Sequence, residues 1–301
     1  MNTQFSTPVV AVESPWRRLL ADFCGSTVAI FGAVLLLLIL IVAVLAPHIS
    51  PQNPYDLAQL DMMSGRLAPG SVNPAGGTFW LGTDDQGRDM LSAIFYGLRI
   101  SLSVGIISTA IALAIGLTAG LSAAYFGRRT QMLIMRLVDI QLSFPAILVA
   151  LILIAALGQG TGKVIAALVT VQWAYYARTV RSAALVERNK EYMEAARCLA
   201  LSPWRIVVGH LLPNCLPPMI IVATVQVAGA IALEATLSFL GLGLPITEPS
   251  LGLLIANGYQ YLLAGDYWIS FFPGVALLLA ILSINLVADQ LRDVLNPRLQ
   301  K

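Results

Sequence analysis

Residues 27–46 read TVAIFGAVLLLLILIVAVLA and contain no charged side chain. A helix rises about 1.5 Å per residue, so roughly 20 apolar residues span the hydrocarbon core of a bilayer. A secretory signal sequence has a shorter apolar core, of about 7 to 15 residues, and its cleavage site is not followed by a proline such as Pro47. This run therefore predicts a retained first membrane-spanning helix.

The composition of the whole chain agrees with a membrane protein. Hydrophobic residues make up 57% and charged residues 11%, and the mean hydropathy is +0.79, whereas a soluble domain carries about 25% charged residues. The net charge of +2 is too small to predict a nucleic-acid partner. The hydrophobic composition predicts that membrane lipid surrounds the chain. The cysteines Cys24, Cys198 and Cys215 lack disulfide or zinc-site spacing, which predicts free thiols.

Six apolar stretches are long enough to be spanning helices. They cover residues 27–46, 100–124, 132–157, 164–185, 217–240 and 268–288. The fourth is the weakest, because Gln172, Arg178 and Arg181 interrupt it. We therefore expect an all-α, polytopic membrane protein with six transmembrane helices and with both chain ends on one side.

The lysines and arginines divide unevenly between the two sides of this topology. Arg66, Arg88, Arg99 and Lys163 fall in the outer segments, and the other fourteen of the 18 fall on the opposite side. Basic residues collect on the cytoplasmic side of inserted proteins. Both termini and the loop 186–214 are therefore expected in the cytoplasm.

The spans divide the chain into four parts. Residues 1–26 form a cytoplasmic N-terminal segment, and residues 27–98 form the first spanning helix and an outer loop. Residues 99–291 form a five-helix core that contains the cytoplasmic loop 186–214, and residues 292–301 form a cytoplasmic tail.

The outer segment 47–98 is rich in Pro, Gly, Asn and Asp, which predicts turns. Its last part predicts a short amphipathic helix at the outer surface, because apolar residues recur there at helical spacing. These residues are Met90, Leu91, Ile94, Phe95 and Leu98. Thr83 and Gln86 have the spacing of a capping box at the start of this helix.

Three aspartates in the same outer segment raise the question of a cation site. They are Asp84, Asp85 and Asp89, but Arg88 stands among them and no calcium-loop spacing is present. Local hydrogen bonding or surface pairing is the expected role, and we expect no metal site in this chain.

The predicted cytoplasmic loop contains two helices joined by a turn. Residues 187–199 are mostly helix formers, and Glu194 can pair with Lys190 four residues earlier. Ser202 has N-cap chemistry and precedes a proline in the first turn, and Pro213 is expected to end the second helix. This arrangement would expose small residues to a partner protein, and a plain amphipathic connector is the alternative.

The EAA motif at 194–196, a small residue at 200 and Leu-Pro at 212–213 resemble the EAA loop of binding-protein-dependent ABC-transporter permeases. In that family the loop is a coupling helix that docks in a groove of the ATPase subunit. The resemblance implies that five residues couple this chain to an ATPase: Glu194, Ala195, Ala196, Ala200 and Pro213. Ala200 and His210 stand where the general pattern has Gly and Ile, and the ending HLLPN at 210–214 is similar to that of peptide permeases.

Two further motifs are similar to those of the C-type subunits of dipeptide and oligopeptide permeases. One is LGTD at 81–84 with GRD at 87–89, and the other is LSFLGLG at 237–243. With the six-helix plan, the resemblance covers essentially the whole chain and implies the type I importer permease fold in an inner membrane. It also implies a homologous permease partner, two ATPase subunits that use ATP and Mg, and an outer solute-binding protein. Nickel and glutathione permeases share these motifs, so these or other small solutes are alternative cargoes to di- and oligopeptides.

Several polar and aromatic side chains fall within or near the predicted spans, where burial is costly unless they face a cavity or another helix. The candidate translocation-path residues are Asp139, Gln172, Trp173, Tyr176, Gln226 and Glu234. A structural role is the alternative for each, and Asp139 can pair with Arg136 on its own helix. Gly116 and Gly120 form a GxxxG pair, which is typical of a close helix contact.

No catalytic constellation is evident in the sequence. The stretch that ends in Lys163 lacks the glycine and the Ser or Thr that a P-loop needs. The two histidines, His48 and His210, fall on opposite predicted sides, so they cannot share a catalytic site. We therefore expect no catalytic site and no cofactor bound by this chain. An ion-coupled secondary transporter and a membrane enzyme are the rival classes. The transporter predicts a charged pathway in the membrane and inverted repeats, and the sequence shows no such pathway or repeat. The enzyme would need the catalytic set that is not evident here.

Overall fold

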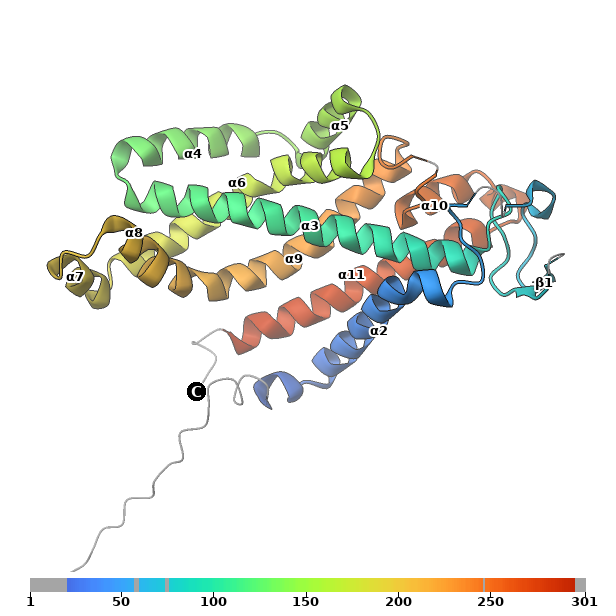
Figure 1. The fold of residues 1–301 in the computed structure, drawn as a ribbon, viewed down its shortest axis with the longest axis horizontal. Helices are drawn as coiled ribbons and strands as arrows, with labels where there is room; N and C mark the ends of the chain where they lie inside the picture. Colours follow the sequence, from blue (N-terminus) through green and yellow to red (C-terminus); the bar gives the residue numbers. More distant parts are fainter. Residues whose placement is uncertain (1–20, 57–59, 74–75, 246, 296–301) are drawn as a thin grey trace, which may run out of the picture.

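The computed structural model describes residues 21–56, 60–73, 76–245 and 247–295. Long helices run beside one another along the molecule (Figure 1). They are α2 (Thr27–Ile49), α3 (Met90–Tyr125), α6 (Thr161–Arg188), α9 (Leu212–Phe239) and α11 (Trp268–Val294). The shorter helices are α4 (Arg128–Leu142), α5 (Ala146–Leu157), α7 (Glu191–Cys198), α8 (Pro203–Ile206) and α10 (Leu251–Tyr259).

The prediction of an all-α fold is confirmed, apart from a minimal hairpin in the outer loop. Strand β1 (Ser71–Val72) pairs antiparallel with β2 (Thr78–Phe79). Two short 3₁₀ turns, Met62–Ser64 and Leu262–Ala264, complete the regular structure of the described loops.

Four helices are each long and apolar enough to cross a membrane: α2, α3, α11 and the continuous helix Pro203–Phe239, which contains α8 and α9. A fifth candidate is the pair α4 and α5, which is bent by 89°. Helix α6 has 28 residues but is less apolar than these. The predicted count of six spans is therefore not confirmed.

The prediction of one helix over residues 132–157 is wrong. α4 ends at Leu142 and α5 begins at Ala146, after the sequence Ser143-Phe144-Pro145. Pro145 has no N–H to donate, and its ring disfavours helical backbone at the residue before it. The apolar run therefore continues through a sharp bend.

The outer amphipathic helix is not a separate element. α3 begins at Met90 and continues without a break for 36 residues, about 54 Å at helical rise. The predicted capping box is also wrong, since Asp89 caps the helix by accepting a hydrogen bond from Ser92 N at 2.9 Å. Met90, Ile94 and Leu98 are buried against α10 and α11, so the apolar face covers protein core.

α6 lies along α3, and two glycines allow the close approach. A Cβ on Gly116 would lie 2.3 Å from Tyr176 Cβ, and one on Gly120 would lie 2.7 Å from Val180 Cβ. The prediction of a close helix contact at the GxxxG pair is confirmed. α6 thus packs closely on α3, and its Gln172 and Arg178 bond to side chains of the neighbouring helices α3 and α4.

The two ends of the bundle carry different elements (Figure 1). α7 and α8 lie at one end, and β1 and α10 lie at the other. α2 begins and α11 ends toward the α7 end, where Gln290 Nε2 donates to Asp22 O at 3.1 Å. The loop that carries the EAA motif and the described chain ends therefore lie toward the same end.

Candidate functional site

One carboxylate holds the corner between α6 and α7. Glu187, which lies beyond the predicted fourth span, accepts hydrogen bonds from Lys190 Nζ at 2.6 Å and from Tyr192 Oη at 2.8 Å. Burial raises the pKa of Glu187, but these two hydrogen bonds outweigh it and hold the pKa below its ordinary value. Burial and the bond to Glu187 raise the pKa of Tyr192 to about 12. An ionised carboxylate and a protonated phenol therefore fix the first turn of α7.

The predicted pair between Glu194 and Lys190 does not form. Lys190 is the N-cap of α7, and its ammonium lies on Glu187 instead. Glu194 is exposed, and its carboxylate has no hydrogen bond or ion pair with the described part of the chain. It is therefore available to another protein.

The opposite face of α7 fixes the helix to the bundle. Met193 and Ala196 are buried in a cluster with apolar residues of α3, α6, α8 and α9. Ala195 is exposed beside Glu194. Of the predicted coupling residues, Ala196 therefore anchors the helix, and Glu194, Ala195, Ala200 and Pro213 are exposed.

α7 ends in a left-handed turn at Ala200, whose φ is 51°. Ala200 N donates to Arg197 O at 2.9 Å, and Leu201 N donates to Ala196 O at 3.3 Å. This is a Schellman motif, in which Gly is usual because a side chain in left-handed backbone costs about 1–2 kcal/mol. Ala200 keeps this turn although it departs from the glycine of the permease pattern.

The start of the second helix is as predicted. Ser202 Oγ accepts a hydrogen bond from Arg205 N at 3.4 Å, and Pro203 occupies the first turn. The prediction that Pro213 ends this helix is wrong. A wider π-helical turn at Val207–Leu211, in which Leu212 N reaches back to Val207 O, precedes Pro213 and lets the helix continue into α9.

Figure 1 shows α7 and α8 together at one end of the bundle. Two large apolar side chains are exposed there. Leu199 and Trp204 are each 73% exposed. Together with the exposed Glu194, Arg197 and Arg205, they give this end a surface of mixed apolar and charged groups, of the kind that marks protein contacts.

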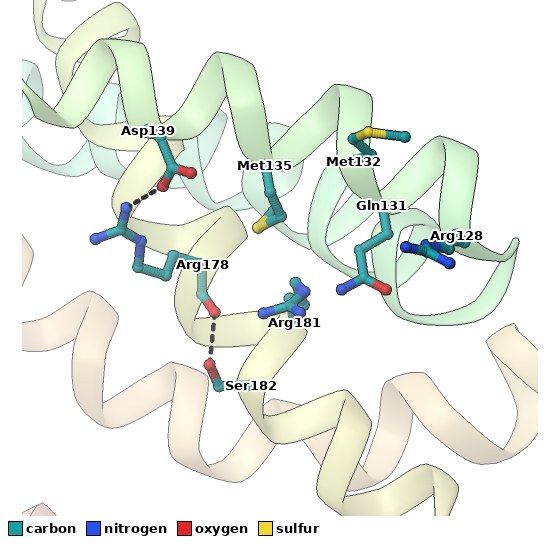
Figure 2. Close-up of a pocket in the computed structure, with 8 residues that line it drawn as sticks. All are labelled: Arg128, Gln131, Met132, Met135, Asp139, Arg178, Arg181 and Ser182. Atoms are coloured by element: carbon teal, nitrogen blue, oxygen red, sulfur yellow. Dashed lines mark hydrogen bonds and ion pairs between the residues drawn. The ribbon is translucent and has the colours of Figure 1, made fainter.

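A second feature is a cavity of about 850 Å³ between α4 and α6, which Figure 2 shows. Its lining residues are Arg128, Gln131, Met132, Met135 and Asp139 of α4, and Arg178, Arg181 and Ser182 of α6. Arg178 Nη2 donates to Asp139 Oδ1 at 2.6 Å. Asp139 therefore pairs across to α6, and the alternative of a pair with Arg136 on its own helix is wrong.

The arginines of this cavity are not among the site residues predicted from the sequence. Arg178 and Arg181 interrupt the fourth apolar stretch and so weaken the prediction of that span. A charged residue at membrane depth is itself a signal of a cavity or a partner. The structure brings both into one cavity with Asp139.

The other candidate path residues on α6 lie between helices. Gln172 is buried, and its Oε1 accepts a hydrogen bond from Thr109 Oγ1 at 3.3 Å. Tyr176 is fully buried, and its side chain packs on Gly116. Trp173 is half-buried against the cluster that joins α4 to α6.

The two candidates on α9 differ from each other. Glu234 is fully buried, and accepts hydrogen bonds from Ser101 Oγ at 3.0 Å and Ser238 Oγ at 2.7 Å. Gln226 is half-buried. The structure thus does not gather the six candidates into one site, and Asp139 is the one that lines the cavity between α4 and α6.

The acidic segment of the outer loop is held by local bonds, as expected. Asp84 Oδ2 contacts Arg88 Nε at 2.6 Å with both side chains buried, and Asp84 Oδ1 accepts from Gln86 N at 2.9 Å. Asp89 caps α3. No group of three or more metal-binding side chains occurs among the described residues.

Known proteins are similar to this chain over most of its length. Residues 112–301 match the family described as binding-protein-dependent transport system inner membrane component, and residues 14–69 match the N-terminal TM domain of oligopeptide transport permease C. The di/tripeptide transport system permease protein DppC of Pseudomonas aeruginosa is 35% identical over 299 residues, which cover 99% of this chain and 97% of that protein. The dipeptide transport system permease protein DppC of Alkalihalophilus pseudofirmus is 34% identical over 287 residues, 95% of this chain and 91% of that protein.

The fold also has a solved counterpart. A chain of the MetNI methionine ABC transporter in inward-facing conformations matches with a TM-score of 0.56 and 24% identity, over 68% of this chain and 97% of that chain. The family match covers more than half of the sequence, and the two relatives align over nearly all of it. This chain therefore belongs to the family of binding-protein-dependent transport system inner membrane components.

Proposed function

We propose that this chain is a permease subunit of an ATP-driven importer that carries di- and oligopeptides across the inner membrane. The observation that carries the proposal is the similarity, over nearly the full length, to relatives named as dipeptide and di/tripeptide transport permeases. As a member of a permease family, the chain is a multi-pass membrane component rather than an enzyme.

Transport by this chain would require three kinds of partner protein. A homologous permease subunit would complete the translocation path, and two ATPase subunits would bind ATP with Mg and hydrolyse it. An outer solute-binding protein would deliver the peptide. Both chain ends and the α7–α8 end would face the cytoplasm, a placement supported by the excess of basic residues on that side.

The α7–α8 end would carry the coupling to the ATPases. Its exposed Glu194, Leu199 and Trp204 offer a charged group and two apolar groups to a partner. A force on α7 would pass to α6 through Glu187, and to α9 through the cluster that contains Met193. Transport then needs no covalent chemistry in this chain, because the work is a shift between two conformations with different affinity for the cargo.

Reconstitution tests the proposal. The complex with its partner permease, ATPases and binding protein is placed in proteoliposomes, and uptake of a radiolabelled dipeptide is compared with uptake of nickel and of glutathione. We expect peptide uptake that needs ATP and that persists when ionophores collapse ion gradients. Uptake of nickel or glutathione without peptide uptake would assign another cargo, and uptake by this chain alone with an ion gradient would overturn the importer assignment.

A further inference from the structure

The cavity between α4 and α6 has an excess of positive charge. Arg128, Arg178 and Arg181 line it together with a single carboxylate, Asp139. Arg178 is engaged with Asp139 at 2.6 Å. The side chains of Arg128 and Arg181 have no hydrogen bond or ion pair with the described part of the chain, and the buried Nε of Arg181 is without an acceptor there. A buried guanidinium N–H without an acceptor is costly, so the cavity has unused capacity to bind an anion.

The cavity also extends far along the bundle. Arg128 begins α4 at the end of α3 that lies toward α7, and Asp139 is eleven residues further along the same helix. At helical rise this is about 16 Å, roughly half the thickness of a hydrocarbon core. Charged side chains at such depth are expected to line a water-filled passage.

The remaining lining suits a ligand with a constant charged group and a variable body. Met132 and Met135 line the wall of α4, and Gln131 and Ser182 add polar groups. Methionine side chains adapt to differently shaped apolar groups. A volume of about 850 Å³ lies within the usual range of small-molecule sites, roughly 300–1,000 Å³.

We propose that this cavity is an anion subsite of the translocation path, in which Arg181, assisted by Arg128, binds the C-terminal carboxylate of the peptide while the methionines contact its side chains. The inference rests on the proposed function, which supplies peptides as cargo. A phospholipid phosphate has the same oxyanion chemistry. A headgroup, however, stays at the membrane surface, whereas the polar lining of the cavity continues to Asp139.

Photo-cross-linking tests the subsite in the whole complex, held in nanodiscs without the binding protein. The probe is a tripeptide that carries benzoylphenylalanine, used as the free acid and as the C-terminal amide. The extent of labelling is measured against probe concentration, and the labelled residues are located by mass spectrometry. The variants are Arg181→Gln, Arg128→Gln and, as a matched control, Arg136→Gln, an exposed arginine of α4 that does not line the cavity.

We expect labelling on α4 or α6 and half-saturation by the acid at a concentration at least about tenfold below that of the amide, the range of one charge-assisted hydrogen bond. Arg181→Gln should remove this preference, Arg128→Gln should reduce it, and Arg136→Gln should preserve it. The exposed side chain of Arg128 has no bond to the described chain, so Arg128→Gln should leave the fold intact and keeps the test informative if Arg181→Gln does not assemble.

Three outcomes would overturn the subsite. They are equal labelling by acid and amide in the wild type, labelling outside α4 and α6, and a preference that survives in Arg181→Gln. In a parallel arm, nanodiscs with and without phosphatidylglycerol are compared. Loss of acid labelling in the anionic lipid, with less bound phosphatidylglycerol in Arg181→Gln, would assign the cavity to lipid phosphate instead. ATP-dependent peptide uptake is measured separately, with the same purified complexes in proteoliposomes that also receive the binding protein, so the proposed function stands or fails independently of the subsite.

Discussion

The hydroxyl of Tyr192 donates a hydrogen bond of 2.8 Å to the carboxylate of Glu187, and so joins the first turn of α7 to the last turn of α6. Glu187 also accepts from Lys190, which leaves its charge compensated although it is largely buried. If α7 passes a movement of the ATPase to the bundle, this corner decides how rigidly α6 follows it.

Tyr192→Phe should weaken coupling, because it removes the hydrogen bond and keeps the ring. A hydrogen bond to a charged group contributes about 1.5–3 kcal/mol. We expect less peptide uptake per ATP hydrolysed in proteoliposomes, with normal amounts of complex. Tyr259→Phe, an exposed tyrosine on α10 at the other end of the bundle, is the control and should keep the wild-type ratio. Equal ratios in both variants would show that the corner has no part in coupling.

Glu194→Ala should abolish transport but not folding. The exposed carboxylate has no partner in the described chain, so its loss should change stability by less than about 0.5 kcal/mol. A lost charge-assisted bond to the ATPase would cost about 1.5–3 kcal/mol. Peptide uptake and transport-stimulated ATPase activity are measured with matched amounts of complex, and Glu191→Ala on the same helix is the control. Normal uptake by Glu194→Ala would show that Glu194 is a solvated surface residue with no part in coupling.

Ala200→Gly should stabilise the end of α7, since Gly adopts left-handed backbone without the cost that Ala200 carries at a φ of 51°. We expect a gain of about 0.4–1 kcal/mol, measured as protection of the loop from limited proteolysis and as thermal stability of the complex. Ala195→Gly, inside the same helix, should have the opposite effect and cost about 1 kcal/mol. The same sign for both substitutions would contradict the Schellman assignment.

Gly116→Ala should separate α3 from α6. The added methyl would lie 2.3 Å from Tyr176 Cβ, and overpacking of this kind costs about 1–3 kcal/mol. Lower thermal stability of the complex in detergent is the expected result. Gly274→Ala on α11, where an added Cβ has no neighbour within 4 Å, should be neutral or stabilising. Equal stability of the two variants would argue against the tight contact.

Asp85→Asn should stabilise the outer loop increasingly as pH rises. Burial, and then the charge of Asp84, raise the pKa of Asp85, and its Oδ1 is buried without a hydrogen-bond partner in the described chain. A raised carboxyl pKa means that the folded state holds the proton more tightly than the unfolded chain. The stabilisation by protonation is therefore full below the ordinary pKa and is lost as pH rises through the folded value.

The measurement is thermal unfolding of wild type and Asp85→Asn between pH 4 and pH 8. The advantage of the variant should be small at the acid end and should level off at neutral pH. A difference that does not change with pH would mean that the carboxylate is not the cause.

Several features of this protein follow from residues that are close together in the sequence. The charge-free run of residues 27–46 requires a membrane, because a bilayer accepts a helix of that length and water does not favour it. Ser202 and Pro203 start a helix through contacts within one turn. The motifs around residues 81–89, 194–196 and 237–243 indicate the family without any knowledge of the fold, since each is a short local signature.

Other features depend on how distant segments pack. In the sequence, Arg136 is a possible partner for Asp139 on the same helix. In the structure α4 packs on α6, and Asp139 pairs instead with Arg178, 39 residues away. Lys190 likewise bonds to Glu187 rather than Glu194, because it caps α7 from outside the helix.

The membrane class, the helical content, the family and the local caps can thus be predicted from the amino-acid sequence, because they rest on composition or on contacts within a few residues. Three features depend instead on how the helices pack: α3 runs unbroken from the outer loop, Pro213 lies inside a longer helix, and the arginines that interrupt the fourth apolar stretch line a cavity. Burial and charge pairing depend on which helix faces which, and this is set by contacts between residues far apart in the sequence, such as that of Gly116 with Tyr176.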